Sequence, residues 1–225
     1  MYAETRISHN WLIKKAVNDK VRERLPDLYG NVLDFGCGLR PFETDILRHA
    51  TDYVGIDWSD TLHGMRADII SNLNAPLPFA NEAADHIVSF EVMEHLAEPR
   101  IMLAEAFRIL RHGGQLTLSV PFQWWLHEAP WDYYRYTRYG LHYMLEHAGF
   151  SDVSVAPTTG FWSMWILKLN YQTTRLIRGS SPARALIRAG LIPFWWVNQH
   201  LALLADRYWP EERETAGYFV TAVKP

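Results

Sequence analysis

Two glycines and an acidic residue form the strongest chemical pattern in the chain. Residues 32–38 read Val-Leu-Asp-Phe-Gly-Cys-Gly, and Asp57 follows nineteen positions after Gly38. A glycine-rich turn between a strand and a helix lets the backbone approach a ligand closely. An acid about 20 residues further on, at the end of the next strand, can hydrogen-bond the two hydroxyls of a ribose. The pattern therefore predicts a site for a ligand that contains a ribose.

Two further residues indicate which ligand this is. A dinucleotide fingerprint needs a third glycine, and Phe42 stands in its place. Asp34, two residues before the first glycine, adds a carboxylate that would repel a pyrophosphate but attract a sulfonium and an ammonium group. The pattern favours S-adenosylmethionine over a nicotinamide dinucleotide.

Strands and helices alternate through the first 120 residues, as a layered sheet requires. The apolar runs predict strands at residues 31–35, 52–57, 66–69, 85–90 and 115–120. Helical periodicity, capping residues and prolines predict helices at residues 8–25, 41–50 and 99–110, starting at Ser8, at Pro41 and at Pro99. Gly113 and Gly114 are read as the stop of the third helix. Such alternation predicts a parallel sheet with helices on both faces.

The rhythm changes after residue 120. An aromatic loop (121–136) precedes a helix from Thr137 to Gly149, a strand at 153–155, a helical segment at 160–209 and a last strand at 218–223. Interruptions of the helical segment are expected at 179–182 and at Pro193. We therefore expect an α/β fold in one domain of residues 1–225. It is a doubly wound, mostly parallel, seven-stranded Rossmann-like sheet with an aromatic-rich helical insertion (160–209) before the last strand.

Several short motifs occur together in an order that matches a known family. They are Asp34-x-Gly36-x-Gly38, Asp57, Ala67-Asp68, Leu77-Pro-Phe79, Phe90-Glu-Val-Met-Glu-His95 and Arg108-Ile-Leu-Arg-His-Gly-Gly114. Over residues 30–150 the chain resembles the class I S-adenosylmethionine-dependent methyltransferases, in particular the compact bacterial type 11 group. The resemblance implies an enzyme (EC 2.1.1.-) that uses S-adenosylmethionine as its cofactor.

The resemblance also implies the cofactor-binding residues, which are Asp34, Gly36, Cys37, Gly38, Arg40, Asp57, Trp58, Asp68, Ile69, Phe90 and Glu91. The glycines would hold the methionine end and Asp57 the ribose. Asp68 would accept a hydrogen bond from the adenine amino group, with Ile69 against the ring. Phe90 and Glu91 would border the methionine amino group. Arg40 departs from the small residue usual in the family, and it would either pair with the cofactor carboxylate or turn its stem to solvent.

The aromatic loop after the fifth strand should overhang the strand ends and face the methyl acceptor. A histidine or carboxylate there could remove a proton from a hydroxyl acceptor, and the candidates are His127, Glu128 and His95. Alternatively, His127 and Asp132 only lock the loop backbone, and His95 only caps or packs a helical stretch. The loop resembles methyltransferase-like proteins found beside bacterial surface-polysaccharide enzymes, which implies a sugar or lipid-linked acceptor. No H-E-x-x-H motif occurs and His127 has no second histidine at ligand spacing, so we predict no metal.

Composition and charge limit the partners. The chain has 22 basic and 25 acidic residues, which argues against a nucleic-acid partner. Residues 160–209 hold six basic residues and one acidic residue, with five of the ten tryptophans. That segment could contact a membrane surface, cover the acceptor as a lid, or pack on the sheet or on a second subunit as a homodimer. With neither a signal-peptide layout nor an apolar run of about 18 residues, we expect a cytoplasmic protein, peripheral to the inner membrane face if the segment binds lipid.

Two other functions are compatible with such a sequence. One is a nicotinamide-dependent oxidoreductase, against which the missing third glycine argues. The other is a catalytically silent protein that keeps the fold but binds the cofactor weakly, which the unusual Arg40 would suit.

Overall fold

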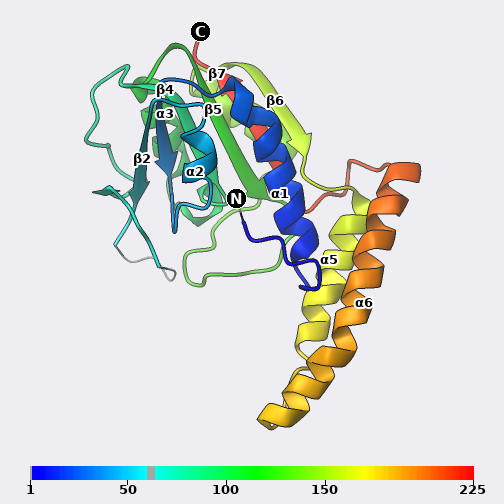
Figure 1. Ribbon diagram of the computed structural model, residues 1–225. Helices are drawn as coiled ribbons and strands as arrows, with labels where there is room; N and C mark the ends of the chain where they lie inside the picture. The colour runs from blue at the N-terminus through cyan, green and yellow to red at the C-terminus, as the bar shows by residue number, and fades with distance from the viewer. Residues whose placement is uncertain (1, 60–63) are drawn as a thin grey trace.

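The computed structural model describes residues 2–59 and 64–225, and a single seven-stranded sheet forms its centre (Figure 1). The strands lie in the order β3-β2-β1-β4-β5-β7-β6. Their bounds are β1 Asn31–Phe35, β2 Asp52–Asp57, β3 Ile69–Ile70, β4 Ala84–Phe90, β5 Leu110–Pro121, β6 Ser151–Pro157 and β7 Gly217–Val223. Neighbouring strands are parallel except that β7 runs antiparallel to both β5 and β6. The predicted mostly parallel, seven-stranded sheet is confirmed.

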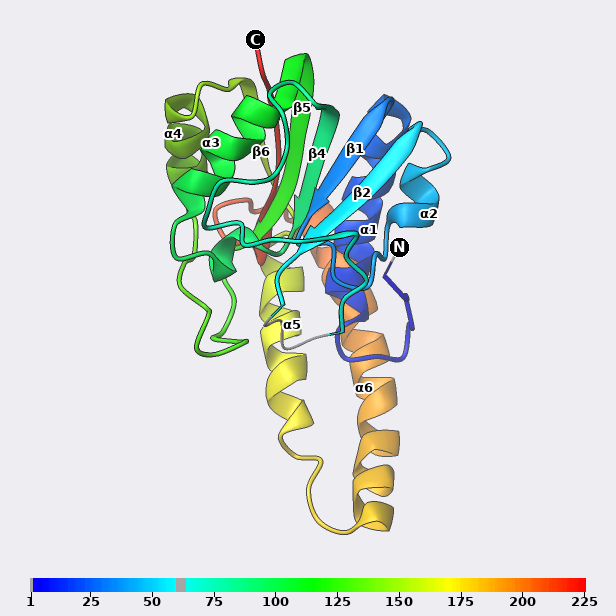
Figure 2. The same ribbon diagram turned by 90° about the vertical axis from the view of Figure 1, so that its left-hand side faces the viewer.

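Helices cover both faces of this sheet. The helices are α1 Trp11–Arg24, α2 Glu43–Ile46, α3 Pro99–Ile109, α4 Arg138–His147, α5 Phe161–Thr174 and α6 Ser181–Tyr208, with short 3₁₀ helices at Leu25–Asp27 and Met93–His95. Figure 2 shows α1 and α2 on one face and α3 and α4 on the other, which is the doubly wound arrangement. As predicted, the Thr137 side chain caps α4 by accepting a hydrogen bond from the Gly140 N–H at 3.1 Å.

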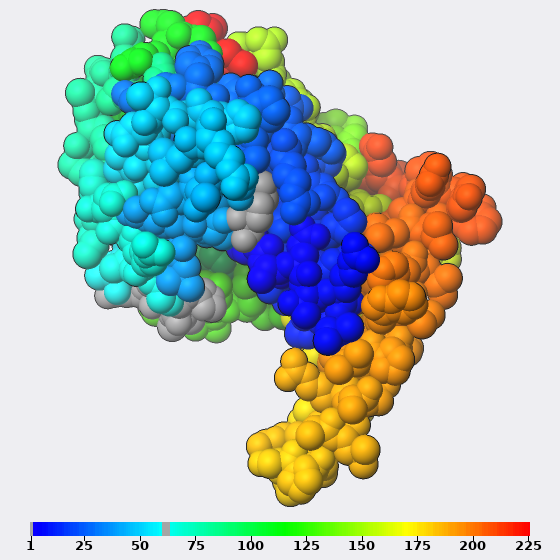
Figure 3. Space-filling view, viewed as in Figure 1, coloured from blue at the N-terminus to red at the C-terminus, as the bar shows by residue number. Residues whose placement is uncertain are grey.

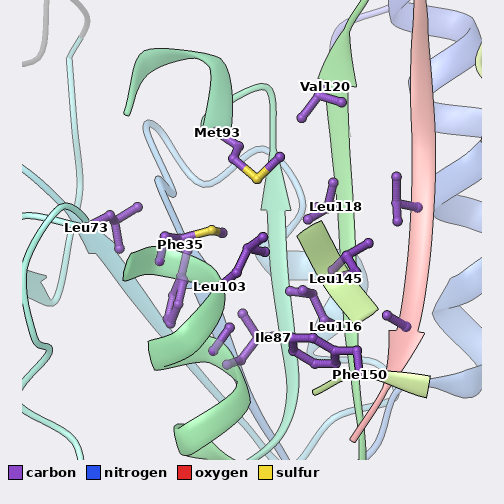
Figure 4. Close-up of a cluster of buried hydrophobic side chains, with 14 of the residues drawn as sticks. Phe35, Leu73, Ile87, Met93, Leu103, Leu116, Leu118, Val120, Leu145 and Phe150 are labelled. Atoms are coloured by element: carbon purple, nitrogen blue, oxygen red, sulfur yellow. The ribbon is translucent and has the colours of Figure 1, made fainter. Parts of the chain in front are cut away.

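Alternate residues of the central strands supply the two halves of the core. Ile87 of β4 packs with Leu103 of α3 and Leu145 of α4 in the cluster drawn in Figure 4. Its neighbour Val88 joins Val21 of α1 in a second cluster on the opposite face. Because both faces are covered, every residue of β4 is buried, and these include the polar Asp85, His86 and Ser89.

Several of the predicted elements have different bounds in the structure. Helix α1 begins after Asn10 instead of Ser8, whose hydroxyl donates to Asn10 Oδ1 at 2.6 Å. Helix α2 was predicted over 41–50 but spans four residues and continues as turns. The third strand was predicted over 66–69. It is the two-residue β3 instead, because the Arg66 N–H bonds the glycine turn at Gly38 O (2.8 Å) and not a strand.

The glycine pair at 113–114 does not end a helix, so that prediction was wrong. Helix α3 ends at Ile109, and β5 begins at the next residue. The pairing of β5 with β4 shifts register here, Gly113 has a φ of +79°, and a Cβ at Gly114 would lie 2.9 Å from two carbonyl oxygens. The glycines therefore allow an irregularity inside a strand.

Residues 160–209 form an antiparallel helical hairpin, α5 and α6, that projects away from the sheet at its carboxyl end (Figures 1 and 3). The interruption predicted near 179–182 lies at residues 175–180, between the two helices. Pro193, which was predicted to interrupt the helix, lies inside α6, since losing one N–H donor does not end a 28-residue helix that packs along α5. Gln199 fixes the base of the hairpin by accepting from the Leu12 N–H and donating to Ser8 O, both at 3.0 Å.

Candidate cofactor and acceptor site

The turn after β1 needs glycine at two positions for different reasons. Gly36 has a φ of +78° and Gly38 a φ of +51°, both in the left-handed region. A Cβ at Gly36 would lie 2.3 Å from Val92 Cγ2, so this glycine lets the turn pack on the residues after β4. A Cβ at Gly38 would meet no atom within 4 Å. Open space therefore lies against the backbone of Gly38, where a ligand can approach.

Asp57, at the carboxyl end of β2, is bonded to this turn. Its Oδ2 accepts the Gly38 N–H and its Oδ1 accepts the Trp58 N–H, each at 2.8 Å. The carboxylate is 9% exposed and borders the same open space. The glycine turn after β1 and the carboxylate at the end of β2 are therefore brought together, as the sequence pattern predicted.

A central cavity of about 150 Å³ lies between these ends and the segment after β4. We call it the central cavity; it is lined by Gly36, Gly38, Asp57, Trp58, Asn72, Leu73, Asn74, Glu91, Val92, His95, Leu96, Glu128 and Trp131. Five predicted cofactor residues and two predicted catalytic residues are among them. Asn72 and Asn74 were missed, although both directly follow the carboxyl end of β3, where ligand-binding residues of such sheets gather.

A second cavity of about 430 Å³ lies across the glycine turn, and we call it the Asp34 cavity. It is lined by Tyr2, Ala3, Asp34, Gly36, Cys37, Gly38, Leu39, Pro41, Phe42, Gly64 and Phe90. The Asp34 carboxyl is buried and accepts a hydrogen bond from the Tyr53 hydroxyl at 2.5 Å. Burial raises the pKa of Asp34 to about 7. A cationic ligand would stabilise its charged form.

Burial also settles the chemistry of Cys37 in this wall. It raises the pKa of the Cys37 thiol to about 12, so the thiol is uncharged near neutral pH. Cys37 therefore lines the Asp34 cavity as an uncharged side chain.

Arg40 adopts neither of the two orientations that the sequence left open. Its φ is +57°, and its side chain is 10% exposed, paired with Asp68 at 2.5 Å and Glu43 at 3.1 Å. The guanidinium also lies over the Tyr53 ring, 5.6 Å from the centroid. Arg40 therefore stabilises the glycine turn through these contacts. Its side chain neither turns to solvent nor lines one of the two cavities.

Asp68 and Ile69 are placed away from the cavities, contrary to the prediction of adenine contacts. Asp68 accepts the Gly55 N–H at 2.9 Å and pairs with Arg40. Neither Asp68 nor Ile69 is among the described residues that line the central or Asp34 cavity. The reason is register: β3 begins at Ile69, so Asp68 lies at its amino end, and Asn72 follows its carboxyl end.

The three predicted catalytic residues converge beside the central cavity. The ring centroids of His95 and His127 are 4.9 Å apart, and His95 Nε2 lies 3.8 Å from Glu128 Oε2. His95 belongs to the 3₁₀ helix after β4, whereas the other two belong to the loop after β5. The loop is bonded to that helix because the Tyr133 and Tyr134 N–H groups donate to Glu94 O, at 2.9 and 3.2 Å.

Asp132 holds the backbone of the loop in place, which is one of the two roles that the sequence left open for it. Its Oδ2 accepts the His127 backbone N–H at 2.9 Å, and both of its oxygens pair with Arg135. Burial opposes ionisation, but the hydrogen bonds from Arg135 and from the His127 backbone lower the pKa of Asp132 to about 2. The ring of His127 faces His95, and its Nδ1 also accepts a hydrogen bond from Arg135 Nη2 at 3.4 Å.

A third cavity of about 220 Å³, the aromatic cavity, lies between the loop and the hairpin. It is lined by Tyr2, Asn10, Ile13, Lys14, Val17, Glu91, Pro121, Trp124, His127, Thr158, Tyr171, Ala216 and Gly217. The Tyr171 ring of α5 contacts the Trp125 ring at a tilt of 55°, with centroids 3.9 Å apart, and Tyr171 lines the cavity, so the hairpin supplies part of the wall. Glu91 borders both this cavity and the central one. It accepts the Ser119 hydroxyl at 2.7 Å, and burial raises its pKa.

A doubly wound sheet with a glycine turn at β1, a carboxylate at the end of β2 and cavities at its carboxyl edge defines a nucleoside-cofactor-binding α/β protein. Comparison with known families identifies it further. Residues 10–155 match a family model described as a methyltransferase domain, and the chain belongs to that family. The prediction of a class I methyltransferase is confirmed, with S-adenosylmethionine as the cofactor, while the finer type 11 group stays a prediction.

The chain is similar to named methyltransferases over part of their length. It is 34% identical over 98 residues to a probable S-adenosylmethionine-dependent methyltransferase of Mycolicibacterium smegmatis, covering 40% of this chain and 38% of the relative. It is 31% identical over 93 residues to a ubiquinone biosynthesis O-methyltransferase of Mesorhizobium japonicum, covering 37% of each chain. The chain thus spans little more than a third of the length of these curated relatives.

A solved structure shows the same fold. The S-adenosylmethionine-dependent methyltransferase from Archaeoglobus fulgidus superposes with a TM-score of 0.59 at 15% identity, covering 96% of this chain and 95% of that one.

Proposed function

We propose that this protein transfers a methyl group from S-adenosylmethionine to a hydroxyl oxygen of a lipid-linked saccharide or similar acceptor. One observation carries the proposal: the glycine turn and Asp57 line the same cavity as His95 and Glu128. A cofactor-binding end and proton-accepting groups thus border one cavity. The relative named as an O-methyltransferase supports oxygen as the methylated atom.

The residues present suit the cofactor. Asp57 is placed for the ribose hydroxyls, and Asn72 and Asn74 offer amide groups on the same wall for the adenine edge. The buried carboxylate of Asp34, across the turn, suits the positive charges of the methionine end. When bound, S-adenosylmethionine supplies an electrophilic methyl group on a sulfonium sulfur.

The acceptor oxygen must lose its proton as it forms the new bond to carbon, and we assign that proton to Glu128. Its carboxylate lines the central cavity beside His95 Nε2. The oxygen gains the methyl carbon, the carbon–sulfur bond breaks, and its electron pair stays on sulfur, so S-adenosylhomocysteine is the other product. Trp58 and Trp131, with centroids 5.2 Å apart, close one side of the cavity and exclude water.

The hairpin supports a lipid-linked acceptor. On α6, Phe194, Val197, Leu201 and Leu204 recur at helical spacing, and each is 42–58% exposed, so they form a single uncovered apolar stripe. Residues 161–205 contain no acidic residue, and four exposed arginines gather around the free end of the hairpin: Arg175, Arg178, Arg184 and Arg188. Such a surface complements an anionic bilayer face. Within residues 2–59 and 64–225 no helix has both the length and the apolar character of a membrane span.

Transfer of labelled methyl groups tests the reaction. We expect label from S-adenosylmethionine to enter the lipid or saccharide fraction of a cell extract, and Glu128→Gln to slow transfer by about 10²–10⁴-fold. Binding of S-adenosylhomocysteine, measured by calorimetry, should be unchanged in that variant, and NADH should give no heat. Glu146→Gln, an exposed change on α4, is the matched control. Label in no fraction, or an unaffected Glu128→Gln, would refute the assignment.

Vesicle sedimentation tests the acceptor's location. The protein should sediment with vesicles that contain phosphatidylglycerol and not with phosphatidylcholine alone, and Arg184→Glu/Arg188→Glu should abolish this. Arg48→Glu/Arg100→Glu carries the same charge change outside the hairpin and should still bind. Equal binding to both vesicles, or a stable dimer in light scattering that buries the stripe, would contradict membrane docking.

A further inference from the structure

Three side chains beside the central cavity form a group with the composition of a metal site. Glu94, His95 and His127 each offer a ligand atom, and these atoms lie within 4.8 Å of one another. They come from two segments, the 3₁₀ helix after β4 and the loop after β5. The backbone bonds from Tyr133 and Tyr134 to Glu94 O hold those segments together.

Glu94 is the most unusual member of this group. Its side chain is 0% exposed, and neither of its carboxylate oxygens has a hydrogen-bond partner among the described residues. A buried carboxylate without partners is costly, and a bound cation removes that cost. His95 Nε2 is 3.5 Å from Glu94 Oε1, and the ligand atom of His127 lies within 4.8 Å, so the carboxylate lies beside the imidazole pair.

Polar partners lie behind both imidazoles, and the one behind His95 orients its ring for coordination. His95 Nδ1 lies 2.9 Å from Trp131 O. Since a carbonyl only accepts, Nδ1 carries the proton and Nε2 keeps its lone pair. His127 Nδ1 accepts a hydrogen bond from Arg135 Nη2 at 3.4 Å and lies 3.3 Å from Asp132 Oδ2, so the Asp132–Arg135 pair lies behind this ring. Metal-binding histidines commonly have such a partner behind the ring.

We propose that Glu94, His95 and His127 bind one divalent cation of the zinc class. Two imidazoles and one carboxylate suit Zn²⁺ better than Mg²⁺ or Ca²⁺, which prefer all-oxygen sites. Metal–ligand bonds of about 2.0–2.2 Å bring tetrahedral ligand atoms to about 3.4 Å from one another, so donors that lie within 4.8 Å need side-chain shifts of about 1 Å to share one ion. The sequence prediction of no metal was based on the missing H-E-x-x-H motif. His95 and His127 are far apart in the sequence and meet only in the fold, so no local motif contains both.

The position of the site indicates its ligand. His95 lines the central cavity and His127 the aromatic cavity, so the ion would lie between the two, with coordination positions open to an acceptor. The fitting acceptor carries a hydroxyl, or two adjacent ones, that can coordinate the ion while Glu128 takes the proton. This role rests on the proposed function, whereas binding of the ion does not.

The test is a titration of chelator-treated protein with Zn²⁺ by calorimetry, and with Co²⁺ by visible absorption. Wild-type protein should bind one ion, and Glu94→Gln and His127→Asn should each weaken binding by about 100-fold or more. His147→Asn, which removes an exposed histidine on α4, should bind as wild type. Because Gln keeps the shape of Glu94 without its charge, we expect that variant to fold and to bind S-adenosylhomocysteine normally.

No binding by folded wild-type protein, or equal binding by Glu94→Gln and His127→Asn, would overturn the proposal. Loss of binding in His147→Asn as well would assign the signal to surface histidines and also overturn it. The metal titration needs no cofactor, so its failure is distinct from a failure to bind S-adenosylhomocysteine, which would refute the proposed function.

Discussion

The two glycines of the turn after β1 offer a matched pair of substitutions with opposite outcomes. Both have positive φ, so alanine at either position should cost about 1–2 kcal/mol in backbone strain. Only at Gly36 does the new Cβ also collide, at 2.3 Å from Val92 Cγ2, and overpacking of this kind typically costs about 1–3 kcal/mol. Gly36→Ala should therefore lose about 2–5 kcal/mol of unfolding free energy, and Gly38→Ala about 1–2 kcal/mol.

Thermal unfolding measures these losses. For a chain of this size, about 2–4 °C is lost per kcal/mol, so Gly36→Ala should unfold roughly 4–20 °C below wild type and Gly38→Ala roughly 2–8 °C below. Binding of S-adenosylhomocysteine, measured by calorimetry, should show the opposite order. Relative to the stability that each variant loses, Gly38→Ala should lose more affinity than Gly36→Ala. The Cβ of Gly38→Ala enters open space at the cavities and should weaken binding by ~10-fold or more, about 1.4 kcal/mol.

A second substitution checks the cause. Val92→Ala removes both colliding methyl groups, so it should recover about 1–3 kcal/mol in the Gly36→Ala background and none in the Gly38→Ala background. Equal stability of the two glycine variants, or no coupling between Gly36 and Val92, would refute the packing argument. Wild-type affinity in Gly38→Ala would refute the placement of the cofactor against this turn.

Three further outcomes are expected. Burial raises the pKa of Asp34 from its ordinary 3.8 to about 7. Protonation of Asp34 therefore contributes to the unfolding free energy in full below pH ~4, and this contribution is lost as the pH rises through 7. A sulfonium favours the carboxylate, so affinity for S-adenosylmethionine relative to S-adenosylhomocysteine should rise between pH 6 and 8 in calorimetry, and Asp34→Asn should lose that rise. Arg40→Ala should lower the urea-unfolding free energy by about 1–3 kcal/mol, because it leaves two carboxylates unpaired, yet change S-adenosylhomocysteine affinity less than ~3-fold. Asp57→Asn should weaken that affinity by ~10-fold or more and Asp68→Asn by less than ~3-fold; the opposite order would restore Asp68 as the adenine contact.

The sheet could be predicted because its information is local. Each parallel strand is an apolar run bounded by glycine, proline or a charged residue, as at residues 31–35 and 85–90. The errors arose where one residue type serves two purposes. Gly113 and Gly114 are as suitable for a strand irregularity as for a helix end, and only pairing with β4 decides between them. Pro193 weakens a helix locally, but packing against α5 is not visible in local sequence.

The cofactor half of the site could be predicted in most positions for a related reason. Positive φ at Gly36 and Gly38 and the carboxylate of Asp57 are requirements on residue type, so they leave a pattern in the sequence. Asn72 was missed because the strand was predicted over 66–69 and is Ile69–Ile70 in the structure, so the adenine contacts were sought at Asp68 and Ile69 instead of after Ile70. A short edge strand carries too few residues to fix its own register.

The acceptor half is different because backbone atoms assemble it. Glu94 O accepts two N–H groups of the loop, Trp131 O accepts from His95, and Met93 O accepts the Tyr136 hydroxyl at 2.9 Å. Every residue type has a carbonyl oxygen, so these contacts leave no pattern that spacing could reveal. The pairing of His95 with His127 is their consequence, and removing one anchor should separate the imidazoles without touching either. Tyr136→Phe, which removes only a hydroxyl, should therefore weaken Zn²⁺ binding more than it weakens S-adenosylhomocysteine binding, whereas equal losses would mean that the tyrosine serves the fold as a whole.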